Sequence, residues 1–319
     1  MKCSSLNDAI RIVEHDLKII SQLQERDIFA PALVGPPGIG KSMGLIKRVQ
    51  KLYDKVIVYS LGITDSDLEF IGLPKIVNKV EVKNPKELET QNIQELETKW
   101  IIPDRLKEAK EAKRALIIFD DFHLMNEQQQ GILQQILTNG RSIHTHVMNN
   151  TDFIFIGNRI QDNAGGFELN TAGISRLHVI ELDPTKEKLA EEWIEWAEKN
   201  TIKLRNGEIH TIHPVIIELV RNKSELIYNF NPDVEIKPFA APRTWKNASL
   251  ILAQYEKAND TEFLMENFEA IFSGIVGDKA ATELLLFYES YTDFDINTII
   301  AETTPFDKIY EKINRAIKL

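Results

Sequence analysis

The chain has 319 residues, of which 43% are hydrophobic and 27% charged, and this composition is typical of a folded protein with room for two domains. A formal net charge of -10 argues against nucleic acid as a bulk partner, and the single cysteine, Cys3, excludes a disulfide framework and a four-cysteine zinc site. No apolar stretch approaches the roughly 18 residues of a membrane span, and the polar N-terminus lacks the pattern of a signal peptide. We therefore expect a cytoplasmic protein without a membrane partner.

Five apolar runs predict the strands of one sheet. They are residues 29–35, 55–62, 114–121, 151–159 and 176–184. Apolar residues at helical spacing predict a helix over 6–26 and a second helix directly after the first run, and Asn126 is placed to cap a third. Apolar strands that alternate with helices indicate an α/β fold, a parallel sheet with helices on both faces. Residues 63–113 follow no clear period, apart from a strand-like stretch at 75–83.

Beyond Pro184 the apolar residues follow helical spacing only. One stripe contains Leu189, Trp193, Trp196 and Ala197. Pro242 stands at a helix-entry position, which tolerates the missing N–H of proline. We therefore predict an α/β domain over 1–183, followed by a smaller α-helical domain over 184–319.

An eight-residue stretch, GPPGIGKS, directly follows the first predicted strand and matches the pattern G-x-x-x-x-G-K-[ST]. Glycines let consecutive backbone N–H groups point at phosphate oxygens, and the N-terminus of the following helix adds a favourable dipole. The lysine would contact the outer phosphates, and the serine hydroxyl would bind Mg²⁺. The sequence thus predicts a nucleotide-phosphate-binding loop that consists of Gly35, Pro36, Pro37, Gly38, Ile39, Gly40, Lys41 and Ser42.

Polar side chains follow two further predicted strands, at the sheet edge where ligands bind in parallel α/β folds. Asp120 and Asp121 end the third apolar run. Asp120 is expected to hold Mg²⁺ together with Ser42, and Asp121 to polarise the attacking water. Asn158 ends the fourth run, where an amide can hold the water or the γ-phosphate. An asparagine after a glycine is equally consistent with an ordinary turn.

These motifs, in this order, resemble an AAA+ ATPase over nearly residues 1–255. The stretches GITDSDLEFIGLP and WIIPDRL resemble the helix-2 insertion of the MoxR-like group, which includes the ATPase subunits of metal chelatases and phage-encoded relatives. The resemblance places that insertion near 63–103. AGISRLHVIEL resembles the arginine-bearing segment of the group, and APRTW resembles its second-sensor helix.

The resemblance also assigns roles to single residues. Asn158 becomes the first sensor, Arg176 the arginine finger that reaches the nucleotide of a neighbouring subunit, and Arg243 the second sensor on a helical lid. Arg141 is the alternative for the contact with the neighbour. The implied protein hydrolyses ATP with Mg²⁺ and acts as a homo-oligomeric ring, commonly a hexamer, that remodels a protein client or works through an adaptor.

The chain departs from the family at one position, because the family usually has Asp-Glu where this chain has Asp120–Asp121. The shorter side chain predicts slow hydrolysis. It also motivates one alternative, a nucleotide-gated binding module with little hydrolysis. A second alternative is a monomeric P-loop kinase or GTPase. The absence of an NKxD guanine motif and the presence of Arg176 and Arg243 disfavour the second alternative.

Two further groups of residues, four histidines and a lysine-rich arm, could bind a ligand or could simply lie on the surface. Closely spaced histidines that could bind a metal, but lack a nearby cluster of cysteines or carboxylates, are interpreted as surface residues; they are His144, His146, His210 and His213. A local basic arm is interpreted as a solvated hairpin, with an acidic partner or a nucleic-acid backbone as its alternative contact; it contains Lys75, Lys79, Lys83 and Lys86.

Overall fold

The computed structural model describes residues 2–23, 29–61, 72–79, 95–138, 142–162, 171–233 and 237–293. The chain divides into two compact units, and each is described by itself. The first unit contains Ala9–Gly35 and Ser42–Glu181, and the second contains Lys2–Asp8, Pro36–Lys41 and the chain from Leu182 onward. Within the described ranges, no helix combines the length and the hydrophobicity that crossing a bilayer requires.

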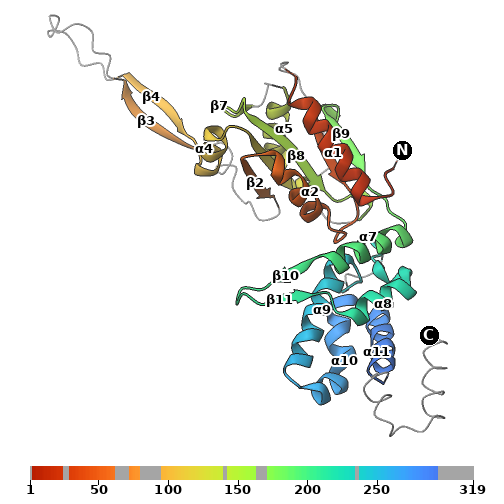
Figure 1. Ribbon diagram of the computed structural model, residues 1–319. Helices are drawn as coiled ribbons and strands as arrows, with labels where there is room; N and C mark the ends of the chain where they lie inside the picture. Colours follow the sequence, from red (N-terminus) through yellow and green to blue (C-terminus); the bar gives the residue numbers. More distant parts are fainter. Residues whose placement is uncertain are drawn as a thin grey trace, which may run out of the picture. The chain divides into compact units, whose positions relative to one another are not determined.

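A five-stranded parallel sheet forms the centre of the first unit (Figure 1). Its strands lie in the order β2–β5–β8–β1–β9. They are β1 (Ala30–Val34), β2 (Lys55–Ser60), β5 (Ala115–Asp120), β8 (Thr151–Gly157) and β9 (Leu177–Glu181). All seven residues of β8 are buried, which is why Phe153–Ile156 are continuously apolar rather than alternating. The five predicted strands are confirmed.

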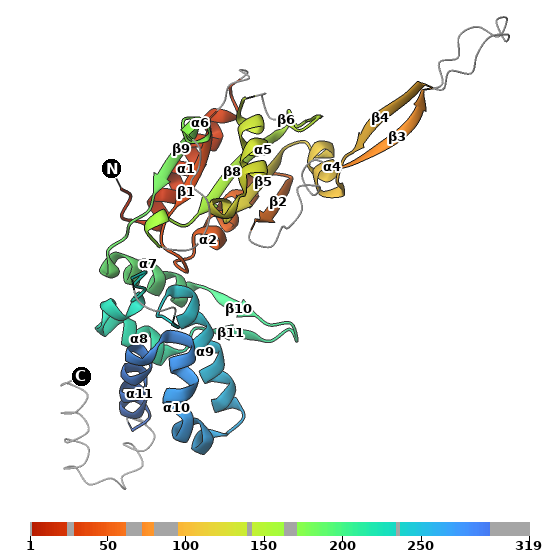
Figure 2. The same ribbon diagram turned by 180° about the vertical axis from the view of Figure 1, so that it is seen from behind.

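Helices cover both faces of this sheet (Figures 1 and 2). They are α1 (Leu6–Ile20), α2 (Lys41–Val49), α4 (Asp104–Glu111), α5 (Glu127–Thr138) and α6 (Thr171–Ile174). The crossover from β1 to β2 runs across the sheet in the opposite direction to those from β2 to β5 to β8. Right-handed connections therefore put α2 on one face and α4 and α5 on the other.

Local hydrogen bonds explain where two of these helices begin and end. Asn126 and Gln129 cap α5 reciprocally, because the Asn126 Oδ1 accepts from Gln129 N at 2.9 Å and the Gln129 Oε1 accepts from Asn126 N at 3.2 Å. The predicted cap is confirmed. The first helix ends at Ile20, earlier than the predicted 26, where the Ser21 hydroxyl donates to the Lys18 carbonyl at 2.8 Å.

The stretch 63–113, which follows no clear period in the sequence, is regular where the structure describes it. It contains α4 and an antiparallel hairpin of β3 (Leu73–Lys79) and β4 (Glu95–Ile101). A second hairpin joins β6 (Ser142–Ile143) to β7 (His146–Val147). The Trp100 and His144 rings pack edge-on with their centroids 4.3 Å apart, and this contact links the two hairpins.

The histidine pair of this second hairpin differs from the sequence interpretation. His144 lies in the turn with a positive φ of 52°, whereas His146 is 7% exposed and pairs with Ile143. The interpretation of His146 as a surface residue is therefore wrong, because it shares the buried side of the hairpin with fully buried Ile143. Of the basic arm, Lys75 is exposed on β3, while Lys83 and Lys86 lie outside the described residues.

The second unit is mainly α-helical. Its helices are α7 (Lys186–Lys199), α8 (Pro214–Asn222), α9 (Pro242–Lys257), α10 (Thr261–Val276) and α11 (Asp278–Asp293). Fully buried Trp245 anchors α9, and its indole Nε1 donates to the Leu226 carbonyl at 2.8 Å. The predicted fold class, a parallel α/β sheet with a smaller helical region after it, is confirmed.

The sequence pattern indicated that no strand follows Pro184, and this prediction is wrong. A short hairpin joins β10 (Thr201–Lys203) to β11 (Ile209–Thr211), and Gly207 supplies the positive φ of 90° that its turn needs. Each strand has only three residues, too few to establish an alternating pattern. The dipeptide Asn206–Gly207 was the available signal for a hairpin.

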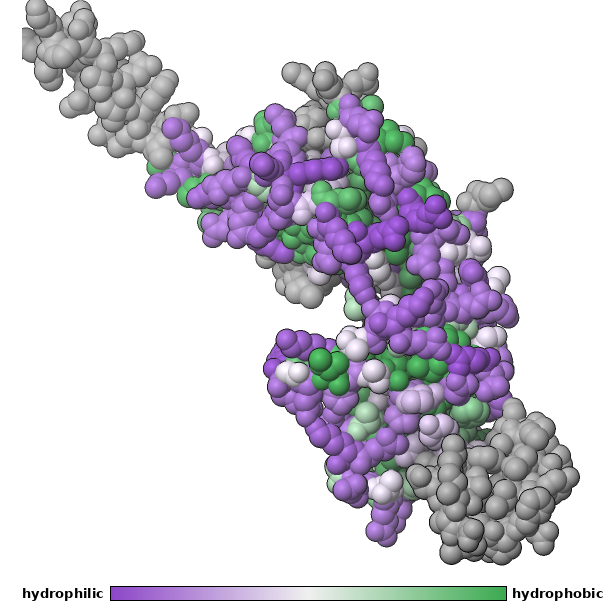
Figure 3. Space-filling view, in the orientation of Figure 1, coloured by the Kyte–Doolittle hydropathy of each residue, from purple (hydrophilic) through white to green (hydrophobic). Residues whose placement is uncertain are grey.

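The two histidines of this region are partly buried, so their interpretation as surface residues is wrong. His213 caps α8: its Nδ1 accepts from Val215 N at 3.3 Å, and its Nε2 lies 2.9 Å from the Glu256 Oε2. The His210 side chain is 14% exposed and lies beside Glu208. On the face drawn in Figure 3, the coloured surface of each unit is mostly hydrophilic, with smaller hydrophobic areas.

Candidate nucleotide-binding site

Three neighbouring strands of the first unit bring the predicted polar strand ends to one edge. β5, β8 and β1 are adjacent in the sheet and parallel, so their carboxyl ends lie together. Asp120 ends β5, Asn158 follows β8, and the glycine loop follows β1. The start of the loop is tied to the end of β8, because Gly35 N donates to the Gly157 carbonyl at 3.2 Å.

The glycine loop adopts a backbone that its glycines make possible. Gly38 has φ 78° and Gly40 has φ 97°, values that side chains with a Cβ rarely adopt. A Cβ at Gly38 would also lie 3.1 Å from the Ala241 Cβ. The loop leads directly into α2, which begins at Lys41, so the N-terminus of a helix faces the loop as an anion site requires.

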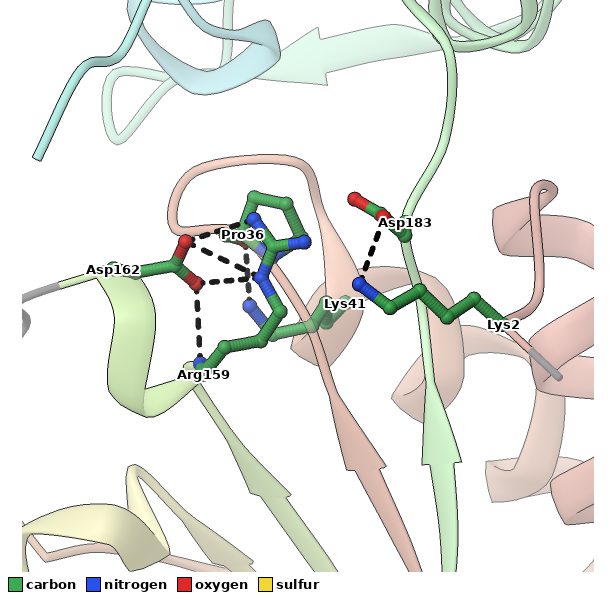
Figure 4. Close-up of polar contacts among 6 residues, drawn as sticks. All are labelled: Lys2, Pro36, Lys41, Arg159, Asp162 and Asp183. Carbon is green, nitrogen blue, oxygen red and sulfur yellow. Dashed lines mark hydrogen bonds and ion pairs between the residues drawn. The ribbon is translucent and has the colours of Figure 1, made fainter.

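Lys41 folds back on its own loop. Its Nζ donates to the Pro36 carbonyl at 2.7 Å, and the residue is 7% exposed (Figure 4). This contact holds a buried positive charge inside the curl of the loop. A phosphate in the curl would offer the ammonium group a full negative charge in place of a neutral carbonyl.

Ser42 and Asp120 meet directly. The Ser42 Oγ donates to the Asp120 Oδ1 at 2.8 Å, and Asp121 N donates to the same carboxylate oxygen at 3.1 Å. A hydroxyl and a carboxylate oxygen are hard ligands of the kind that Mg²⁺ binds. The two residues predicted as metal ligands therefore stand close enough to share one ion, and the donor set fits Mg²⁺.

Asp121 does not continue the strand that Asp120 ends. Its backbone is left-handed, with φ 57° and ψ 37°, and it starts the short 3-10 helix η2 (Phe122–Leu124). Its carbonyl accepts from Leu124 N at 2.9 Å. Aspartate tolerates this conformation better than most residues do, because its short polar side chain can hydrogen-bond locally. The carboxylate of Asp121 is therefore aimed by a turn, whereas that of Asp120 is aimed by the sheet.

Asn158 has a neighbour that the sequence analysis did not identify. His123 of η2 faces it with both ring nitrogens: the Nδ1 accepts from Asn158 N at 3.3 Å, and the Nε2 lies 3.4 Å from the Asn158 Nδ2. The sequence signal for His123 was only its position three residues after Asp120. The site of the first unit thus contains an imidazole beside the predicted sensor.

The arginine after Asn158 is held by a buried carboxylate. The Arg159 guanidinium bonds to Asp162 through Nη2 at 2.8 Å and Nε at 3.0 Å, and Arg159 N donates to the same side chain at 3.1 Å (Figure 4). Asp162 is 2% exposed and belongs to the 3-10 helix η3 (Ile160–Asp162). This bidentate pair fixes the chain segment that leaves β8.

The arginines predicted by resemblance have distinct positions. Arg176 directly precedes β9, and its carbonyl accepts from Ala30 N at 3.1 Å. In the second unit, Arg243 follows Pro242 at the start of α9, its side chain is exposed, and its backbone N donates to the Gly38 carbonyl at 3.2 Å. The start of α9 therefore contacts the glycine loop. Arg141 lies outside the described residues.

No protein-family model and no curated protein matches this chain. Among solved structures, it is similar to Hsp104 in a closed-state reconstruction with ATPγS and FITC-casein, with 12% identity, a TM-score of 0.46, and coverage of 83% of this chain and 46% of that one. It is also similar to S. cerevisiae Hsp104 in an extended complex with casein, with 14% identity, a TM-score of 0.46, and coverage of 80% of this chain and 46% of that one. For a mutant of Thermotoga maritima RuvB, the identity is 13%, the TM-score is 0.35, and the match covers 98% of this chain and 73% of that one. The chain thus spans about half the length of these Hsp104 chains.

Proposed function

We propose that this chain is an AAA+ ATPase that binds Mg-ATP on the loop Gly35–Ser42 and hydrolyses it. The observation that carries the proposal is the 2.8 Å contact between the Ser42 Oγ and the Asp120 Oδ1, directly behind a curled glycine loop that begins a helix. In a P-loop enzyme these two side chains hold the Mg²⁺ that accompanies the nucleotide. The single cysteine supports a reducing compartment, which we take to be the cytoplasm.

Each part of the loop has a defined task in this proposal. Backbone N–H groups of residues 38–42 bind the phosphates, and Lys41 exchanges its contact with the Pro36 carbonyl for the outer phosphate oxygens. Ser42 and Asp120 hold the Mg²⁺, which would neutralise phosphate charge. Asp121 polarises the attacking water, and Asn158 orients it.

We extend the proposal to a ring, because Arg176 acts on the site of the next subunit. A surface that contacts a different surface of its neighbour generates closed rings or filaments, and we propose a hexameric ring that remodels a protein client. Arg243 then senses the γ-phosphate. Its backbone contact with Gly38 supports this role, because it places the start of α9 beside the loop that binds the phosphates. The resemblance of the segments WIIPDRL, AGISRLHVIEL and APRTW to the MoxR-like group supports placing the chain in that group.

One observation favours a second function, a nucleotide-gated binding module with little hydrolysis. Asp121 has a shorter side chain than glutamate, and its left-handed backbone takes it out of the line of β5. A misplacement of the catalytic base by about 1 Å costs roughly a hundredfold in rate. In that case ATP binding, rather than turnover, would control the partner.

Steady-state ATP hydrolysis, measured over a range of protein concentrations, tests the proposal. We expect Mg²⁺-dependent turnover per subunit to rise with concentration as rings assemble, and Lys41→Ala to lack turnover at every concentration. Turnover that is constant per subunit over the full range would support a monomeric enzyme instead. Tight Mg-ATP binding without turnover would support the binding module.

Mixing two inactive variants tests the role of Arg176. Arg176→Ala should keep ATP binding and lose about 10³–10⁵-fold in turnover, the range measured for arginine fingers elsewhere. Lys41→Ala lacks the pocket but keeps the finger, so mixed rings combine a working pocket with a working finger and regain activity. Verified mixed rings without recovery would contradict the contact between subunits.

A further inference from the structure

Two N–H donors of Asn158 face the two ring nitrogens of His123. The backbone N–H points at the Nδ1 with a nitrogen–nitrogen distance of 3.3 Å, and the side-chain amide nitrogen lies 3.4 Å from the Nε2. A neutral imidazole has one acceptor nitrogen and one N–H. The backbone N–H and the side-chain amide therefore cannot both donate to the ring. One of these two groups of Asn158 must turn another atom toward the imidazole.

The side-chain amide is the group that can change. The backbone N–H of Asn158 is fixed by the end of β8, whereas an asparagine amide can rotate by half a turn and exchange its oxygen and nitrogen. Because the Nδ1 accepts from the backbone, the ring proton must sit on the Nε2. An Nε2–H and an amide N–H at this distance would repel each other, so we infer that the amide oxygen faces the ring and that the two amide N–H bonds face away from it.

We propose that His123 is a positioning residue that sets the orientation of the Asn158 amide, so that this side chain offers N–H donors rather than an oxygen to the γ-phosphate or the attacking water. The inference rests on the proposed function, because it names the group that prepares Asn158 for that role. A phosphate is an acceptor, and an amide with its oxygen outward would repel it.

The surroundings of His123 hold the ring in this position. A Cβ on Gly157 would lie 3.2 Å from the His123 Nδ1 and under 3 Å from the Phe122 ring, so the ring approaches the backbone of β8 because residue 157 is a glycine. The turn is closed by Leu124 N, which donates to the Asp121 carbonyl at 2.9 Å. The left-handed turn at Asp121 therefore also delivers His123 to Asn158.

Two amide substitutions separate the two ring nitrogens. In His123→Gln, the amide nitrogen occupies the place of Nε2 and can donate to the Asn158 oxygen. In His123→Asn, the side-chain oxygen occupies the place of Nδ1 and can accept only from the backbone N–H. His123→Leu removes both contacts. We expect single-turnover hydrolysis to fall by about tenfold or more in the Asn and Leu variants, a fraction of the roughly hundredfold cost of a 1 Å misplacement. The Gln variant should recover most of the rate.

ATP affinity and a second substitution show whether His123 acts through Asn158. ATP affinity by calorimetry should stay within about twofold of the parent in all three variants, since a positioning residue of the chemical step touches no ground-state contact. In an Asn158→Ala background, His123→Leu should have no further effect on the rate. An equal loss in both backgrounds, or equal rates in the Asn and Gln variants, would overturn the proposal.

The tautomer of His123 gives a readout that does not depend on turnover. Nitrogen NMR of the 319-residue chain labelled at histidine, with His123→Gln to assign the signal, reports which ring nitrogen is protonated. We expect the proton on Nε2 at pH 8, and a proton on Nδ1 would overturn this inference. A parent chain that binds Mg-ATP without hydrolysing it would instead contradict the proposed function, and the tautomer would still decide the orientation of the amide.

Discussion

Replacing Gly157 by alanine should damage both the stability of the first unit and the site at the end of β8. The added Cβ would lie 2.7 Å from the Phe122 Cε1, 2.8 Å from its Cδ1 and 3.2 Å from the His123 Nδ1. Contacts under 3 Å cannot persist, so a ring or the strand has to move. Phe122 is 3% exposed and packs edge-on against Phe155 at a centroid distance of 6.0 Å, which leaves the ring little room to retreat.

The magnitude follows from this crowding. Overpacking a dense core costs typically about 1–3 kcal/mol, and two sub-van-der-Waals contacts with one buried ring place Gly157→Ala near the middle, at about 2 kcal/mol. For a unit of this size, that corresponds to a melting temperature lowered by about 4–8 °C. Because His123 is displaced as well, we expect single-turnover ATP hydrolysis to fall by about tenfold or more, on the same scale as a small misplacement.

Urea unfolding followed by circular dichroism measures the free energy of unfolding, and Gly131→Ala is the matched control. Gly131 lies in α5, and none of the described atoms comes within 4 Å of a Cβ built there. Alanine in that helix should raise the free energy of unfolding by roughly 0.5–1 kcal/mol. If Gly157→Ala were as stable and as active as the parent, the packing of Phe122 and His123 against β8 would be refuted.

Three further substitutions have distinct expected outcomes. Tyr53→Phe removes the 2.8 Å hydrogen bond to buried Asp152 and should lower the free energy of unfolding by about 1.5–3 kcal/mol, against little change for the partly exposed Tyr255→Phe. Because burial raises the pKa of Tyr53 above its usual value of 10.0, the parent should lose stability as pH rises through 10, and Tyr53→Phe should lose less in urea melts across that range. Asp120→Asn should weaken Mg²⁺-dependent ATP binding and hydrolysis together, seen by calorimetry with and without Mg²⁺; unchanged Mg²⁺ dependence would remove it as a ligand. Asp121→Asn should keep Mg-ATP binding and stop single-turnover hydrolysis, and an unchanged rate would leave the base unassigned.

The strands and the glycine loop were predictable because burial on both faces of a sheet demands continuous apolar runs. β8 and β5 carry such runs, and in their parallel pairing Phe119 lies opposite Phe155. Strand ends of a parallel sheet meet at one edge, so the approach of Ser42 to Asp120 was also accessible from motif order. These features could be predicted from the sequence because polar residues directly follow several buried apolar strands.

Other parts depended on contacts between residues far apart in the chain. β10 and β11 have three residues each, too short for an alternating pattern. His123 belongs to the site only because Asp121 takes a left-handed turn and Gly157 has no side chain. Neither condition produces a periodic signal, so no pattern of hydrophobicity could have placed this imidazole beside Asn158.

The central claim is that residues 35–42 bind the phosphates of Mg-ATP, and calorimetric titration of the parent and of Lys41→Ala with Mg-ATP tests it most directly. Lys41 is the buried positive charge of the loop, with its Nζ 2.7 Å from the Pro36 carbonyl. We predict saturable binding by the parent and abolished or severely weakened binding by the variant, with both proteins folded by circular dichroism. Undiminished affinity in Lys41→Ala would contradict the account and remove this loop as the phosphate site.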